Sequence, residues 1–138
     1  MRVTYYKGEN FERPKARRVE RQIARDYGFS RPAWGVPKGS FSARWDGVLL
    51  APKGVEYEFY LQSCNGSRLW IDDKLIIDHW GDHGWIPGRH GVVQLSQGRH
   101  RIKIEHYHHT GNAALRLCWS GGGIPDNTVL GTPYLLKQ

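Results

Sequence analysis

Cysteine and methionine are scarce in this chain, which has two Cys and one Met among its 138 residues. Two cysteines, Cys64 and Cys118, are too few for the disulfide framework of a small secreted scaffold, and they lack the spacing of a zinc site. A single bridge between them stays open. No apolar run approaches the ~20 residues that a membrane-spanning helix needs, so we expect no such segment. Nor does a signal peptide follow Met1; the chain either stays inside the cell or is one module of a longer exported protein.

Helical periodicity is also weak. The one candidate covers residues 12–25, where only Val19 and Ile23 stand four residues apart among charged residues. A helix with so narrow an apolar face would bury little surface. An extended, charged arm is therefore the better prediction for this segment.

Glycine, proline and aromatic residues, by contrast, are plentiful. The chain has 17 Gly, 7 Pro, 6 Trp, 7 Tyr and 4 Phe, and 39% of its residues are hydrophobic, which favours a folded chain with many turns. From Phe41 onward apolar and polar residues alternate, as in a strand with one buried face. The alternation predicts strands at residues 55–62, 69–71, 74–77, 92–95, 100–107 and 113–119, with a hairpin turn at Asp72-Asp73, a loop at 81–91 and a glycine turn at 121–123. Such short, closely spaced strands predict an all-β fold, a single antiparallel β-sandwich or barrel over residues 1–138.

The order of several motifs resembles the PA14 domain family, a β-barrel module named after a fragment of a bacterial toxin's protective antigen. The resemblance runs through essentially the whole chain. It is carried by the aromatic pair Tyr5-Tyr6, FSARWDG (41–47), GVEYEFYLQS (54–63), RLWIDDKLIIDHWGDHG (68–84), RIKIEHY (101–107) and NAALRLCW (112–119).

The resemblance implies a compact β-sandwich or barrel that serves as an accessory module. Members of the family occur in glycosidases, adhesins, toxins and signalling proteins; several bind carbohydrate, and none is itself a catalyst. We therefore expect a non-catalytic, carbohydrate-binding module, part of a larger protein that is extracellular or at the cell surface. The alternative is a structural or protein-interaction domain that docks on a partner.

Some fungal adhesins of the family hold a calcium ion with two successive aspartates in the loop before the Arg-Leu strand, and the ion bridges sugar hydroxyls. In this chain Cys64 and Asn65 stand at those positions. Calcium prefers charged oxygen ligands, and a thiol with a neutral amide is a poor substitute. We therefore expect no cofactor, although Asn112 could offer an amide oxygen from the other half of such a site.

Three loops, 64–67, 81–88 and 110–112, are expected to meet at one end of the fold and to contact the ligand. Amide and guanidinium groups would supply hydrogen bonds, and an indole would supply an apolar platform for a sugar ring. The predicted ligand-binding residues are Asn65, Arg68, Asp82, His83, Trp85 and Asn112.

The tryptophans divide by their position in the pattern. Trp45 and Trp119 lie within predicted strands and are expected in the core. Trp80 and Trp85 flank the loop that begins at Gly81. Trp80 is expected to close one end of the barrel, whereas Trp85 is expected to be exposed.

Two groups of residues allow a metal-binding or a catalytic interpretation, and each group has a simpler one. His106 and His108 fall on one face of a strand and could begin a zinc site, but His106 stands where relatives tend to have an aromatic residue. Asp72 and Asp73 could suggest acid-base chemistry, yet turn chemistry explains them more simply. We expect Asp78 to fix backbone, and we expect no enzymatic activity.

The chain is basic, with a net charge of +7 and a pI near 9.6. Such a charge makes acidic glycans, nucleic acids and anionic lipids plausible partners, although a solvated basic surface explains it as well. Few aromatic residues interleave with the basic ones, so nucleic acid is not expected, and binding to acidic polymers is the third option. The charge is concentrated in Arg13, Lys15, Arg17, Arg18, Arg21, Arg25 and Arg31.

Overall fold

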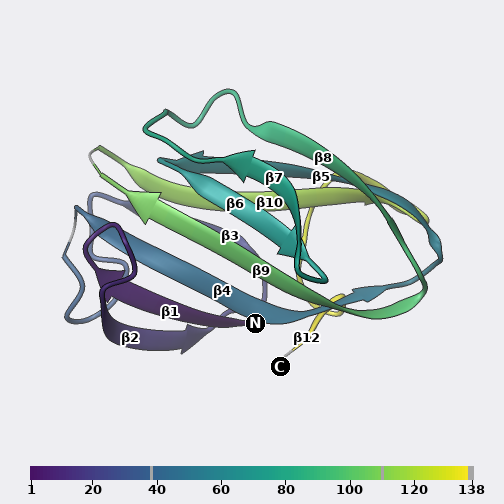
Figure 1. The fold of residues 1–138 in the computed structure, drawn as a ribbon, viewed down its shortest axis with the longest axis horizontal. Helices are drawn as coiled ribbons and strands as arrows, with labels where there is room; N and C mark the ends of the chain where they lie inside the picture. Colours follow the sequence, from purple (N-terminus) through teal and green to yellow (C-terminus); the bar gives the residue numbers. More distant parts are fainter. Residues whose placement is uncertain (38, 110, 137–138) are drawn as a thin grey trace.

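Two antiparallel β-sheets face each other in this protein (Figure 1). The computed structural model describes residues 1–37, 39–109 and 111–136 and forms twelve strands, with no helix in those ranges. The prediction of an all-β antiparallel sandwich is confirmed. No helix of the described residues is long and apolar enough to cross a membrane.

The larger sheet has seven strands, which follow the order β2-β1-β4-β9-β6-β7, while β12 pairs with β4. Every pairing between these strands is antiparallel. The strands are β1 (Arg2–Lys7), β2 (Arg13–Val19), β4 (Phe41–Ala51), β6 (Ser67–Ile71), β7 (Lys74–His79), β9 (Gly98–His108) and β12 (Leu135–Leu136).

The smaller sheet has five strands in the order β11-β10-β5-β8, with β3 paired to β10. These pairings are antiparallel too. The strands are β3 (Ala24–Gly28), β5 (Val55–Cys64), β8 (Arg89–Leu95), β10 (Ala113–Gly121) and β11 (Ile124–Val129).

The core lies between the sheets and is built by the alternation visible in the sequence. In β5 the side chains of Tyr57, Phe59 and Leu61 are buried, because every second residue of a strand faces the same side. Trp45 and Trp119 are 0% and 1% exposed, as expected for core residues. The ring of Trp119 stacks on Tyr57, with 5.3 Å between centroids.

The hairpin predicted at Asp72-Asp73 is confirmed. Both residues have positive φ, 50° and 66°, the conformation that a tight two-residue hairpin requires and that Asp tolerates. The turn joins β6 to β7. Asp78 fixes backbone as predicted, since its carboxylate accepts a hydrogen bond from the Trp80 N–H.

Residues 12–25 are extended, as predicted, but they do not form a free arm. β2 pairs with β1 along its length, and β3 pairs with β10. The sequence showed the extended state but not the pairing, because the charged residues gave no buried face to recognise.

Several predictions about element boundaries and burial are corrected. Strands β1, β11 and β12 were not foreseen; β11 has no buried residue and β12 is only two residues long. The loop predicted at 81–91 ends earlier, since β8 begins at Arg89. Trp80 does not close the barrel; it is half-buried, and its ring packs edge-on against Tyr107, 4.8 Å between centroids. Trp85, expected to be exposed, is half-buried as well.

One end of the sandwich collects most of the long loops, and we call it the loop end. In Figure 1 it lies at the left, where the β1–β2 connection and the β9–β10 connection turn back. The segments 29–37 and 80–88 and the end of β5 also reach it. Cys64, at this end, and Cys118 are both free thiols, so the bridge that the sequence left open is not formed.

Candidate functional site

A hollow of about 520 Å³ opens at the loop end, and we call it the amide hollow. Strand β3 contributes Asp26, the end of β5 contributes Cys64, and the 80–88 segment contributes Trp85. Asn112 enters from the connection that precedes β10. The remaining lining residues are Ala24, Arg25, Ala114, Leu115 and Arg116.

The amide hollow mixes the groups that bind a polar ring. Trp85 offers an indole face, Asp26 a carboxylate, Asn112 an amide, and the neighbouring Arg25 and Arg116 offer guanidinium donors. A pocket with an apolar wall and a few convergent polar groups is the usual form of a small-ligand site. The arrangement suits binding, since it brings hydrogen-bond donors, acceptors and an aromatic surface around one space.

Asn65 holds the walls of the site together. Its side chain is 8% exposed; its amide nitrogen donates to the His83 carbonyl at 3.0 Å, and its amide oxygen accepts the His109 N–H at 2.7 Å. The side chain therefore joins the 80–88 segment to the end of β9. Both polar atoms of Asn65 are satisfied within the protein, so this predicted ligand-binding residue lies behind the hollow and positions its loops.

The carbonyl of Cys64 is a second anchor. Nε2 of His106 donates to it at 2.8 Å, and Nδ1 of His108 lies 3.0 Å away. Nε2 of His108 also lies 2.8 Å from the Gly111 carbonyl, which connects the β9–β10 loop to the same point. Complete burial lowers the pKa of His106 to about 4, so the ring is neutral at pH 7. Both imidazoles face inward from β9, as the strand period predicted.

The chain beside this carbonyl has three further features. The Cys64–Asn65 peptide bond is cis. A Cβ at Gly66 would clash with the ring of Tyr107 and would stand 2.9 Å from the Gly81 nitrogen, so the backbones approach here at a distance that only glycine allows. The thiol of Cys64 has a raised pKa because of burial and, secondly, the Asp26 carboxylate nearby.

Of the other predicted residues, Trp85 and Asn112 meet in the amide hollow, whereas Arg68, Asp82 and His83 do not line it. Arg68 lies on the outer face of the larger sheet, where it pairs with Asp78 at 3.0 Å. The carboxylate of Asp82 accepts the Tyr107 hydroxyl at 2.7 Å.

His83 stacks on His79 with 3.7 Å between ring centroids, and its two nitrogens lie 2.9 Å and 2.8 Å from the carbonyls of His79 and Gly84. Both rings therefore stiffen the 80–88 segment. Burial, and then the neighbouring His83, lowers the pKa of His79. Thr110, which belongs to the third predicted loop, lies outside the described residues.

The donor set around the amide hollow does not fit a calcium ion. Asp26 is the one carboxylate among its described lining residues, and it already accepts the Gly28 N–H at 3.0 Å. The amide oxygen of Asn65 is bound by backbone, and a neutral thiol is a poor ligand for a hard cation. Within the described ranges no three His, Cys, Asp or Glu side chains are grouped as metal ligands would be.

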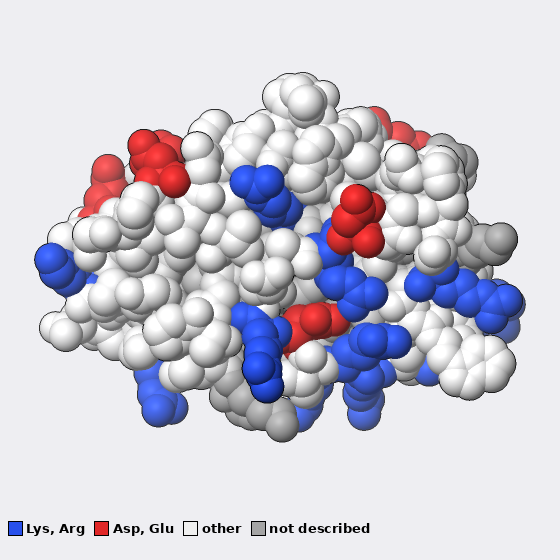
Figure 2. Space-filling model, turned by 180° about the vertical axis from the view of Figure 1, so that it is seen from behind, with Lys and Arg blue, Asp and Glu red and all other residues white. Residues whose placement is uncertain are grey.

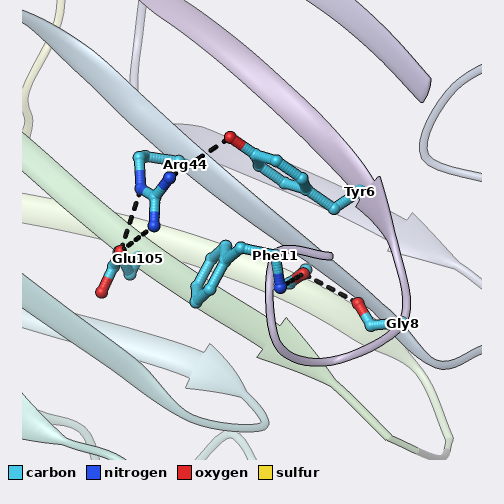
Figure 3. Close-up of polar contacts among 6 residues, drawn as sticks. Tyr6, Gly8, Phe11, Arg44 and Glu105 are labelled. Carbon is cyan, nitrogen blue, oxygen red and sulfur yellow. Dashed lines mark hydrogen bonds and ion pairs between the residues drawn. The ribbon is translucent and has the colours of Figure 1, made fainter. Parts of the chain in front are cut away.

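A second hollow, of about 390 Å³, lies beside the β1–β2 connection and is acidic. Figure 3 shows how this connection is fixed: Phe11 folds over the larger sheet, with Arg44 4.5 Å from its ring centroid. Two nitrogens of Arg44 bind one oxygen of Glu105, at 2.9 and 2.6 Å. The Phe11 N–H donates to the Ser42 hydroxyl, which in turn donates to the Gly8 carbonyl. Glu9, Glu12, Asn10, Trp80 and Tyr107 are among the residues that line this hollow.

Sequence reasoning missed two exposed features of the loop end. Asp26 lies in a segment that showed no apolar alternation, and only the pairing of β3 with β10 brings it to the amide hollow. Trp34 is 82% exposed, the most exposed of the large hydrophobic residues. The sequence could have indicated this exposure, because a tryptophan between Pro32 and Pro37 lies in a turn-rich segment.

Known proteins include chains that are similar to this one. The anti-sigma-I factor RsgI3 of Acetivibrio thermocellus is 30% identical over 120 residues, which are 87% of this chain and 19% of that protein. An anti-sigma factor domain-containing protein from Clostridium clariflavum is 33% identical with a TM-score of 0.89, over 97% of this chain and 45% of that one. A PA14 sugar-binding domain from an RTX adhesin is 16% identical with a TM-score of 0.81, over 99% and 97% of the two chains, which shows the fold.

This chain thus spans less than half of each of these two anti-sigma relatives. The model of the PA14 domain matches residues 1–130. The sequence motifs, the antiparallel sandwich and this match agree, and the chain belongs to the PA14 domain family.

Proposed function

We propose that this PA14 domain is a non-catalytic carbohydrate-binding module and that the amide hollow is its sugar site. The observation that carries the proposal is the convergence of Trp85, Asp26 and Asn112 around one space of about 520 Å³. An indole face suits the C–H groups of a sugar ring, while carboxylate and amide groups bind hydroxyls. The similarity of fold to a sugar-binding PA14 domain of an adhesin supports it.

Binding at this site would not depend on calcium, because Cys64 and Asn65 offer no carboxylate. The direct contacts of Asp26, Asn112 and the arginines would replace the ion. Arg68, Asp82 and His83, which the sequence also suggested, would act outside the hollow, by shaping the 80–88 segment and the sheet beside it. The fold neighbours from adhesins favour a place outside the cell or at its surface.

The test is a glycan array probed with the full chain, once with calcium and once with chelator. Trp85→Ala and Asn112→Ala are the site variants. Trp70→Ala is the matched control, because Trp70 is also a half-buried tryptophan but lies on the larger sheet, against Lys103. We expect each site variant to weaken binding by about tenfold, the size of one lost hydrogen bond or aromatic contact.

Equal binding with calcium and with chelator would support direct contacts. A silent array, or equal losses in Trp85→Ala and Trp70→Ala, would overturn the assignment of the site.

A second candidate function is docking on another domain of a longer protein. β7 and β8 end their sheets and contact each other, and near them Leu75, Ile86 and Val92 expose large apolar side chains; Ile86 is 78% exposed. Large apolar side chains exposed along such an edge favour an interaction surface. The anti-sigma relatives are more than twice as long as this chain, which favours a neighbouring domain as the occupant.

Left uncovered, this apolar edge should make the isolated chain self-associate at high concentration. Light scattering during size-exclusion chromatography measures this, with Ile86→Lys combined with Val92→Lys as the variant that removes it. A chain that stays monomeric at every concentration would speak against the docking role.

A further inference from the structure

A third hollow at the loop end, of about 320 Å³, is lined by cations, and we call it the basic hollow. Lys7 comes from the end of β1, Lys15 from β2 and Arg31 from the segment that follows β3. The segment Gly35, Val36 and Pro37 completes the lining. Three positive side chains from separate parts of the chain therefore surround one space.

A β-bulge helps to bring Lys15 into this group. Tyr5 pairs with Ala16 and Tyr6 pairs with Pro14, so Lys15 is an extra residue without a partner on β1. A bulge of this kind re-aims a side chain and is common next to binding sites. Regular alternation would have left Lys15 on the outer face with Arg17, whose partner Thr4 faces outward.

The cations of the basic hollow are not neutralised by the protein. Within residues 1–37, 39–109 and 111–136, Lys7, Lys15 and Arg31 form no ion pair, whereas Arg25, Arg44, Arg68 and Arg101 each bind a carboxylate. Like charges around one hollow repel each other unless an anion lies between them. Figure 2 shows Lys and Arg side chains at the right of the view, toward the loop end, with few acidic residues near them.

Two exposed aromatic residues belong to the chain segment that also carries Arg31 and residues 35–37 of the lining. Trp34 immediately precedes Gly35 of the lining and is 82% exposed, and Phe29 is 70% exposed. The segment that presents them is anchored: Arg25 donates to the Pro32 carbonyl at 3.3 Å, and the Val36 N–H donates to the Ala33 carbonyl at 3.2 Å. An exposed indole on an anchored segment offers a preformed surface for a ring.

We propose that the basic hollow binds an anionic polysaccharide, with a carboxylate or sulfate group among Lys7, Lys15 and Arg31 and with Trp34 against a sugar ring. This inference rests on the proposed carbohydrate binding and adds the chemical class of the ligand. Charge-assisted hydrogen bonds from lysine and arginine hold such anions strongly. A single hollow with one exposed indole on the residue that precedes its lining fits one charged sugar unit better than a nucleic acid, which needs aromatic rings along a groove.

The test measures binding of the full chain to alginate, which carries carboxylates, and to dextran sulfate, which carries sulfates, with neutral dextran as the uncharged polymer. The site variant is the triple substitution Lys7→Gln, Lys15→Gln and Arg31→Gln. The control variant is Arg17→Gln, Arg21→Gln and Arg99→Gln, which removes the same charge from exposed positions outside the hollow. Near-ultraviolet circular dichroism checks that both variants keep the fold.

We expect binding to at least one charged polymer, weaker at higher salt. The site variant should lose at least about tenfold in affinity, and the control variant should lose much less, since dispersed charge adds only weak long-range attraction. Trp34→Ala should weaken binding of the polymer but not of free sulfate. Preference between alginate and dextran sulfate identifies the anion.

Equal losses in the two triple variants would overturn the proposal, because they would show unspecific attraction by net charge. So would tighter binding to a single-stranded oligonucleotide or to anionic lipid vesicles than to either polysaccharide, or no binding to any charged polymer. Failure of the amide hollow is distinguishable: Trp85→Ala would then leave neutral glycans on the array unaffected, while the basic hollow would still respond to its own triple variant.

Discussion

The middle of the sandwich and the interior next to the loop end are both buried, but they are held by different forces. In the middle, the ring of Tyr57 stacks on Trp119 and that of Phe59 packs against it at a tilt, with 5.3 and 6.0 Å between the centroids. Next to the loop end several of the buried residues are polar, and each of their hydrogen bonds depends on one donor and one acceptor. These residues include Ser63, Asn65, Ser67, His106 and His108.

The difference shows how a small domain keeps loops in place when its described residues form neither a helix nor a disulfide. Apolar packing is non-directional and fixes how the sheets lie on each other. Directed hydrogen bonds to backbone fix where a loop goes, because an unmade buried bond is costly. The Cys64 carbonyl and the Asn65 amide are the points where β5, β9 and the 80–88 segment meet.

The largest effect is expected in the middle. Trp119→Ala should lower the free energy of unfolding by about 3–5 kcal/mol, since it leaves a cavity among stacked rings. Urea denaturation measures the change. The matched control is Trp34→Ala, which removes an exposed indole and should change stability by less than about 0.5 kcal/mol. An equal loss of stability in the two variants would contradict the difference between the buried and the exposed tryptophan.

The polar interior should make stability depend on pH. The pKa of His106 is about 4 in the fold and about 6.5 in the unfolded chain, so the unfolded state binds more protons between these values. Stability should therefore fall by about 3 kcal/mol as the pH falls from about 6.5 to 4. Denaturation at a series of pH values measures this slope.

His106→Phe should flatten that dependence, because it leaves no group to protonate beside Phe41. The lowered pKa of His79 adds to the slope, whereas the raised pKa of His100 opposes it. An unchanged slope in the variant would show that the protonation of His106 is not the cause.

Asn65→Ala should lower the free energy of unfolding by less than Trp119→Ala does, and its effect should be local. Asn65→Ala leaves the His109 N–H and the His83 carbonyl without their partner, at a cost of about 1–3 kcal/mol. Faster amide hydrogen exchange is expected at residues 81–88 and near His109. Asn10→Ala, at an exposed position on the β1–β2 connection, is the control. Uniform exchange across the chain would contradict a local role.

The smallest effect is expected at a half-exposed contact far from the loop end, where Nδ1 of His100 lies 2.6 Å from the Asp72 carboxylate. Partial burial by itself would lower the pKa of His100, but this bond outweighs burial and raises it. Burial would likewise raise the pKa of Asp72, but the same bond helps to lower it. The contribution of His100 to the stability of the fold is therefore complete below the pKa that this residue has in the unfolded chain. It is lost as the pH rises through the pKa that it has in the fold.

Asp72→Asn keeps the turn, because Asn tolerates positive φ. It should lower the free energy of unfolding by less than about 1 kcal/mol at pH 5.5 and by still less at pH 8. Thermal unfolding at the two pH values measures this. A larger cost at pH 8 would contradict the role of His100.

Much of the fold could be predicted because a two-residue period identifies a strand by itself. The core positions of Trp45 and Trp119, the turn at Asp72 and the extended state of residues 12–25 all followed from local pattern. The pattern also indicated which loops could form one end of the fold. The role of each side chain in them could not be assigned, since Asn65 and Asn112 look alike in sequence, yet one is buried and the other lines the hollow.

The sequence by itself therefore determined the class of the fold, the family, the basic charge and the absence of a carboxylate pair at residues 64 and 65. Only the tertiary structure decided which cations and aromatic rings share a hollow. Lys7, Lys15 and Arg31 meet because a bulge shifts one strand and because the segment after β3 crosses to the larger sheet. Local periodicity reports which side of a strand is buried, but contacts between distant segments depend on strand pairing, which the pattern of a single strand does not contain.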